Sequence, residues 1–74
     1  MDIKWKDGFV IETKYEDGTV MISANKEGLI SLANIFNALA EDKVDAGTHI
    51  HLDRYNSLED DSVELIIEKS NENS

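Results

Sequence analysis

The stretch FVIETKYEDGTVMISA, residues 9–24, decides the first part of the fold. At its centre stands Asp17-Gly18, a favoured two-residue loop for a β-hairpin. Apolar and polar residues alternate on both sides of this loop, as they do in a half-buried strand. The loop fixes the register and predicts three cross-strand pairs on one face: Ile11 with Ala24, Thr13 with Ile22, and Tyr15 with Val20.

A further short strand is predicted before this hairpin, over residues 3–5. The connection Lys6-Asp7-Gly8 ends in glycine and suits a type I turn with a glycine bulge. This turn sets Trp5 opposite Phe9. The start of the chain therefore predicts a three-stranded meander.

A helix over residues 26–42 is predicted to follow, with Asn25 as its N-cap. One apolar stripe at helical spacing is expected to face the sheet. It comprises Leu29, Leu32, Ala33, Phe36, Leu39 and Ala40. Ser31, Asn34, Ala38 and Glu41 are expected on the opposite side.

Two more strands are predicted after Gly47, over residues 48–53 and 63–69, joined by a polar connection with Tyr55 and Leu58 as anchors. The order predicts an α+β fold: one mostly antiparallel sheet of about five strands (β-β-β-α-β-β), with a single helix on one face. Residues 1–69 are expected to form one domain, and residues 70–74 a polar tail that frays. The other face of the sheet is expected to stay uncovered.

Composition limits the classes of partner. The chain has 74 residues, no cysteine and a net charge of −9, with 16 acidic against 7 basic residues. Such a charge repels phosphate backbones and anionic lipid, so nucleic acid and membranes are not expected as partners, whereas a basic protein is. No apolar run approaches the ~18 residues of a membrane span, and the N-terminus lacks the order of a secretory signal. We therefore expect a cytoplasmic protein.

The pattern His49-x-His51-x-Asp53 is the arrangement closest to a reactive site. On a strand these three side chains share a face, so they are weak candidates for holding a divalent metal. The same residues also suit a hydrophilic sheet face next to Glu64, or a protein interface. No other histidine and no cysteine is present to complete a metal shell, so we expect no metal and no cofactor.

Catalytic motifs are missing from the sequence. The four glycines are separated, no phosphate-binding loop or nucleophile elbow occurs, and a Cys-His pair is excluded by the lack of cysteine. The neighbouring acids Asp60 and Asp61 belong to an acidic run that suits a solvated turn. The sequence predicts a binding protein and no enzyme.

Three stretches carry a resemblance to a known family. They are SANKEGLISLAN at residues 23–34, GTHIHLD at 47–53, and SLEDDSVELIIE at 57–68. Together they are similar to immunity protein family thirty-two of the bacterial polymorphic toxin systems, over residues 22–69. The resemblance implies a small cytosolic protein that binds and neutralises a cognate toxin encoded beside it. Many such toxins are nucleases with basic clefts, which an acidic protein suits.

Candidate partner-binding residues follow from the expected uncovered face and the acidic run. The polar and charged candidates are His49, His51, Asp53, Glu59, Asp60, Asp61 and Glu64, with Met21 and Ile66 as apolar anchors. Two alternatives stay open: metal binding through His49, His51 and Asp53, and self-association to a homodimer. Self-association is suggested by Val10, Met21 and Ile66 on the expected open face, or by an exposed strand edge.

Overall fold

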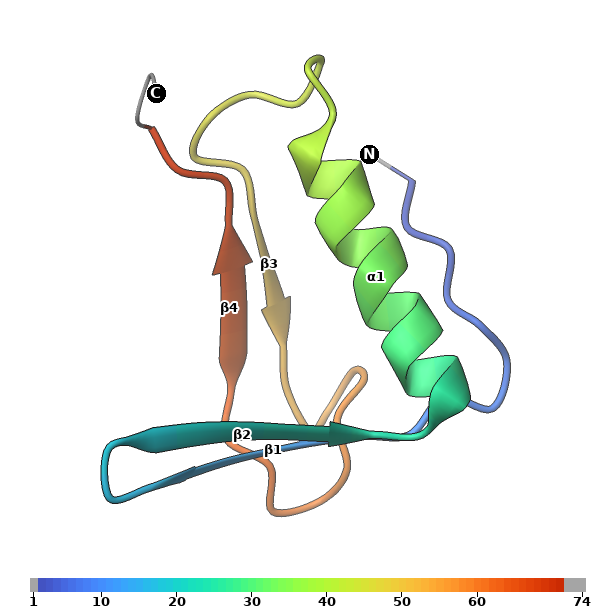
Figure 1. The fold of residues 1–74 in the computed structure, drawn as a ribbon, viewed down its shortest axis with the longest axis vertical. Coiled ribbons are helices and arrows are strands. Elements are labelled where there is room, and N and C mark those ends of the chain that lie inside the picture. Colours follow the sequence, from blue (N-terminus) through green and yellow to red (C-terminus); the bar gives the residue numbers. More distant parts are fainter. Residues whose placement is uncertain (1, 72–74) are drawn as a thin grey trace.

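The computed structural model describes residues 2–71. Four strands and one helix form within this range: β1 (Ile11–Glu16), β2 (Thr19–Ala24), α1 (Lys26–Ala40), β3 (His49–Leu52) and β4 (Leu65–Glu68). β1 pairs with β2, and β3 pairs with β4, both antiparallel (Figure 1). The expected fraying of residues 70–74 concerns mainly residues 72–74, which lie outside the described residues.

The hairpin is confirmed with its predicted register. Ile11 lies opposite Ala24, Thr13 opposite Ile22, and Tyr15 opposite Val20. Asp17 and Gly18 have φ angles of 51° and 80°. Positive φ at both central residues defines a type I′ turn, whose twist matches that of the two strands.

The prediction of a single five-stranded sheet is wrong, because the strands form two separate two-stranded sheets. Residues 3–5 form no strand. The turn at Lys6-Asp7-Gly8 does form, but the chain before it lies along α1 (Figure 1). There the Lys6 amide donates to Ser31 Oγ at 2.8 Å, and Asn34 Nδ2 donates to the Lys4 carbonyl at 2.8 Å. These side chains bind the backbone at Lys4, within the predicted strand, and at Lys6, next to it, and so hold this segment to α1.

The second sheet is kept apart from the first because another segment already occupies the outer edge of β1. The Glu59 amide donates to the Ile11 carbonyl at 2.9 Å, and the Val63 amide donates to the Thr13 carbonyl at 3.2 Å. The hydroxyl of Thr13, a fully buried residue, donates back to the Val63 carbonyl. The chain therefore leaves β1 just before β4, and β4 runs away from the hairpin at a steep angle (Figure 1).

The predicted buried face of the helix is wrong in part: Leu32 and Leu39 are buried as expected, but the other four members of the stripe are exposed. The residues that α1 buries are Gly28, Ser31, Leu32, Ile35, Ala38 and Leu39, whereas Leu29 is 56 % exposed and Phe36 49 % exposed. The helix approaches the hairpin at Gly28, where an added Cβ would lie 2.6 Å from the Val10 carbonyl oxygen. Only glycine fits such a contact, and this contact sets which face turns inward.

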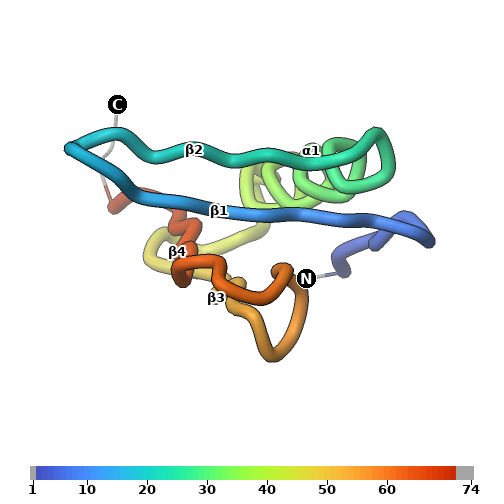
Figure 2. Tube along the Cα trace, turned by 90° about the horizontal axis from the view of Figure 1, so that it is seen from below, coloured from blue at the N-terminus to red at the C-terminus, as the bar shows by residue number. Residues whose placement is uncertain are grey.

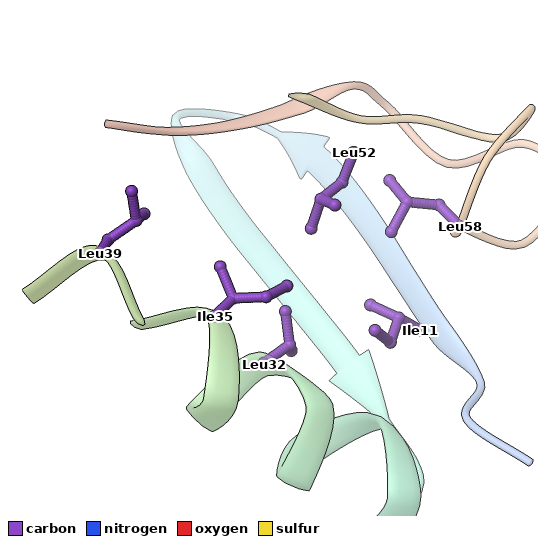
Figure 3. Close-up of a cluster of buried hydrophobic side chains, with 6 residues drawn as sticks. All are labelled: Ile11, Leu32, Ile35, Leu39, Leu52 and Leu58. Carbon is purple, nitrogen blue, oxygen red and sulfur yellow. The ribbon is translucent and has the colours of Figure 1, made fainter. Parts of the chain in front are cut away.

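The core is small and joins all parts of the chain. Its buried members are Ile11, Leu32, Ile35, Leu39, Leu52 and Leu58 (Figure 3). Of the two expected anchors of the connection, Leu58 is buried and Tyr55 is exposed. Seen from below, β2 and α1 lie along one side of β1, and β3 and β4 on the other (Figure 2).

Asn25 holds the start of α1 to the preceding chain, and its removal gives a first prediction. Its Oδ1 accepts from the amides of Gly28 (2.7 Å) and Val10 (2.9 Å), and its Nδ2 donates to the Gly8 carbonyl at 2.9 Å. Loss of an N-cap alone costs about 1 kcal/mol, so we expect Asn25→Ala to lower the free energy of unfolding by about 1–2 kcal/mol in urea titrations. Asn25→Asp keeps both accepting bonds and should cost less; equal losses would contradict this account.

Candidate partner-binding surface

The outward face of the β3–β4 sheet carries several of the predicted binding residues. The register pairs His51 with Ile66 and His49 with Glu68, while Ile50 and Ile67 pair on the inward face, against the core. Because side chains alternate along a strand, the outward face comprises His49, His51, Glu64, Ile66 and Glu68. All five side chains are exposed.

The two histidines are held in place by their Nδ1 atoms. His51 Nδ1 lies 2.9 Å from Glu64 Oε2, and His49 Nδ1 lies 3.1 Å from the Gly47 carbonyl oxygen. The rings meet edge to face, with centroids 5.0 Å apart. A carbonyl oxygen only accepts, so the proton of neutral His49 is assigned to Nδ1. The expected proximity of His51 and Glu64 is therefore present, on a solvent-exposed face.

Asp53 does not join the histidines. Its Oδ1 accepts from the amides of Tyr55 (2.9 Å) and Asn56 (3.1 Å), an Asx turn that starts the connection to β4. Its carbonyl oxygen accepts from the amides of Ser57 and Leu58, and it shares the Asn56 amide with Oδ1. The carboxylate thus shapes the loop, and within residues 2–71 no group of three or more His, Cys, Asp or Glu side chains is placed to hold a metal ion.

The acidic run packs beside the hairpin, away from the histidines. Glu59 and Asp60 line an open hollow together with Glu12 of β1, and Val10, Ser23 and Leu58 contribute to its walls. Asp61 follows at a positive φ of 71°, in the turn that carries the chain from this hollow towards β4. Glu12 is a contributor that the sequence analysis missed. Its outward position in the alternating strand was visible, but its approach to residues 59–60 depends on the tertiary fold.

The two apolar anchors do not share a face. Met21 belongs to β2, where it lines a shallow hollow with Lys14 and Glu16, whereas Ile66 lies on the outward face of β4. They were placed together on the assumption of one continuous sheet. The predicted residues therefore form two groups: the histidine face of β3–β4, and the acidic turn with the far face of the hairpin.

Most of the carboxylates have no basic partner. Over residues 2–71 one ion pair joins side chains of fixed charge, Lys14 with Glu12 at 3.9 Å, while the contact of His51 with Glu64 at 2.9 Å is an ion pair only when the imidazole is protonated. The remaining acidic side chains of this range carry charge that no ion pair neutralises. Unpaired charges of one sign sum to a field that attracts a partner of the opposite sign.

The site and fold define a small acidic α+β protein whose charged side chains are exposed on its surface. A comparison with family models places it further: the Immunity protein 32 model matches residues 19–70. This match spans more than half of the chain, so the chain belongs to the Immunity protein 32 family, as its resemblance indicated. Searches of curated proteins and of solved structures each find no match. Between residues 2 and 71 there is no helix of the length and apolarity needed to cross a membrane.

Proposed function

We propose that this protein binds and neutralises a cognate toxin in the cytoplasm of the cell that produces it. Membership of an immunity protein family supports the role. The observation that carries the choice of partner is the acidic excess: a net charge of −9, with few carboxylates in ion pairs. A protein with this field associates fastest with a basic surface. The proposed partner is therefore a basic toxin domain, and a nuclease with a phosphate-binding cleft is a suitable type.

We propose that the carboxylates of Glu59 and Asp60, with Asp61 next to them, bind in the basic cleft of the toxin. They stand on a turn that hydrogen bonds tie to β1, so little conformational entropy is lost when they bind. Carboxylates held in this way occupy positions that a basic cleft offers to phosphates. The histidine face of β3–β4 is proposed to contribute polar contacts beside them, with Ile66 as an apolar centre.

The test is co-expression with the toxin encoded next to the gene, followed by kinetic measurement of the purified complex. The wild-type protein should restore growth and bind the toxin. We expect the triple variant Glu59→Gln, Asp60→Asn, Asp61→Asn to lower the association rate about tenfold at low salt, with a weaker salt dependence. Asparagine tolerates the left-handed backbone at position 61, so the turn should persist.

A control with the same change in net charge is available at the far end of the molecule. Glu41, Asp42 and Asp45 are all exposed and lie beyond the C-terminal end of α1. The variant Glu41→Gln, Asp42→Asn, Asp45→Asn should keep most of the association rate. Equal losses in both triple variants would show that only total charge matters, and absence of both complex and rescue would refute the proposed function.

A further inference from the structure

The outer edge of β2 is a strand edge without a partner among residues 2–71. The Asn25 amide donates to the Val10 carbonyl, which fixes the alternation of hydrogen bonds along the hairpin. By this alternation the backbone groups of Val20, Ile22 and Ala24 point away from β1. On the other side of the hairpin, the equivalent groups of Ile11 and Thr13 in β1 form hydrogen bonds with residues 59–63. β2 is therefore the open edge of the hairpin.

The β2 edge belongs to a long segment of the chain, residues 19–40, that has few charged side chains. β2 has no charged residue, and α1 has only Lys26 and Glu27, in its first turn. The net charge of residues 19–40 is therefore zero, and the whole −9 comes from the rest of the chain. Natural edge strands are commonly protected by lysine, proline or a bulge, and β2 carries none of these.

Large apolar side chains are exposed both on the hairpin and on the helix that follows it. Tyr15, Val20 and Ile22 share the face of the hairpin on which α1 packs, yet all three are exposed, and Val20 is 59 % exposed. Leu29 and Phe36, seven residues apart and hence on one face of α1, are exposed as well. We call these five residues, together with the β2 edge, the neutral surface.

The molecule also exposes more area than its size requires. The accessible surface is 5410 Å² for a chain of 8.3 kDa, against about 4,600 Å² for a folded monomer of this mass. This excess belongs to the whole chain and is not located on one surface, but a chain with this much exposed area can supply the ~800 Å² that each partner buries in a standard interface. Two-stranded sheets are marginal by themselves, so burial of the neutral surface would stabilise the fold.

We propose that the occupant of the neutral surface is a second copy of this chain. The β2 strands of two protomers pair antiparallel across a two-fold axis, giving a four-stranded sheet, and Leu29 and Phe36 of each protomer pack near the new strand pair. Such an interface is self-complementary, as two-fold symmetry requires. Two chains of charge −9 repel one another, and the neutral surface is where they approach with the least charge between them. A basic partner would gain no electrostatic attraction from this uncharged surface.

The dimer goes beyond the proposed toxin binding and does not depend on it. The acidic turn borders the far face of the hairpin, through the hollow that Glu12 and Ser23 line. The two interactions also differ in the sign of their response to salt. Salt screens the repulsion between two acidic copies and should tighten the dimer, whereas it should weaken a complex with a basic toxin.

Light scattering coupled to size-exclusion chromatography tests the proposal on the full chain without toxin. As the concentration rises from low micromolar to millimolar, the molar mass should rise from 8.3 kDa towards twice that value. When salt is added, this rise should occur at lower protein concentrations. Val20→Glu places like charges across the two-fold axis and should weaken the dimer at least about tenfold. Ile66→Glu makes the same change at a residue of similar exposure, 52 %, on β4 and should leave the dimer intact.

A measurement on the unaltered chain makes the test independent of variant folding. Amide hydrogen exchange at Val20 and Ile22 should slow as the concentration rises, because their outward N–H groups pair only in the dimer. A monomer mass at millimolar concentration overturns the proposal. So does a dimer in which Val20→Glu and Ile66→Glu have equal effects, or in which these two amides exchange at an unchanged rate.

Discussion

Replacing Ile35 by alanine is expected to lower the free energy of unfolding by about 2–5 kcal/mol. Ile35 is fully buried, at 0 % exposure, among the side chains that join α1 to the hairpin and to β3 (Figure 3). Removing its three outer carbon atoms leaves a cavity that the surrounding elements can fill only in part. A domain of this size has a total stability of about 4–11 kcal/mol, so the variant should be close to unfolding at 37 °C. Urea unfolding followed by circular dichroism measures the effect.

The neighbouring residue provides the control. Phe36 has a larger apolar side chain than Ile35, but it is 49 % exposed on the neutral surface. Phe36→Ala should therefore cost less than about 1 kcal/mol in the monomer. If Phe36→Ala lowered the free energy of unfolding as much as Ile35→Ala, or more, this would contradict the structure, in which Ile35 lies on the buried face of α1 and Phe36 does not.

The hairpin was predictable because its signals are local. Asp17-Gly18 selects one turn type, and that turn fixes the register of the strands that it joins. Asn25 was likewise identified as the N-cap from its position before the helical pattern. Both features depend on residues within a few positions of one another, and no tertiary contact overrides them.

The buried face of α1 was not predictable from hydrophobicity. Residues 28–40 are uncharged, and apolar side chains cover two adjacent stripes of the helix, one through Leu29 and Phe36 and one through Leu32 and Ile35. The choice between them depends on Gly28 and Ser31, small residues that carry little weight in a hydrophobic pattern. Ser31 is buried because its hydroxyl accepts from the Lys6 amide, a contact between distant segments.

The prediction of a single sheet failed for a related reason. Period-two alternation shows which segments extend, but it does not show which edges pair. Glu59 and Val63 occupy the edge of β1 from within a polar connection that reads as a loop. As a result the candidate binding residues divided into two groups, since Met21 and Ile66 were placed together only through the assumed sheet. The histidine face was predicted more closely, because alternation alone puts His49 and His51 on one side.

The contact at Gly28 can be tested by a substitution for which helix propensity and packing predict opposite results. Propensity favours alanine over glycine in a helix by about 1 kcal/mol. At this position, however, the added Cβ would lie 2.6 Å from the Val10 carbonyl oxygen and 3.0 Å from atoms of both Ala24 and Ile11. A backbone carbonyl cannot move aside without shifting β1, and this carbonyl already accepts from the Asn25 amide. We therefore expect Gly28→Ala to destabilise the protein by about 1–3 kcal/mol, as overpacking does.

Ala33→Gly makes the reverse exchange in the same helix at an exposed position, where propensity acts alone. It should cost about 0.5–1 kcal/mol, as glycine does in an exposed helix interior. Both variants should then be less stable than the parent in urea unfolding, although they change helix propensity in opposite directions. A Gly28→Ala protein that is more stable than the parent would contradict the close approach of α1 to the hairpin. The observed burial of Ser31 and Ile35, and with it the exposure of Leu29 and Phe36 on the neutral surface, would then lose its physical cause.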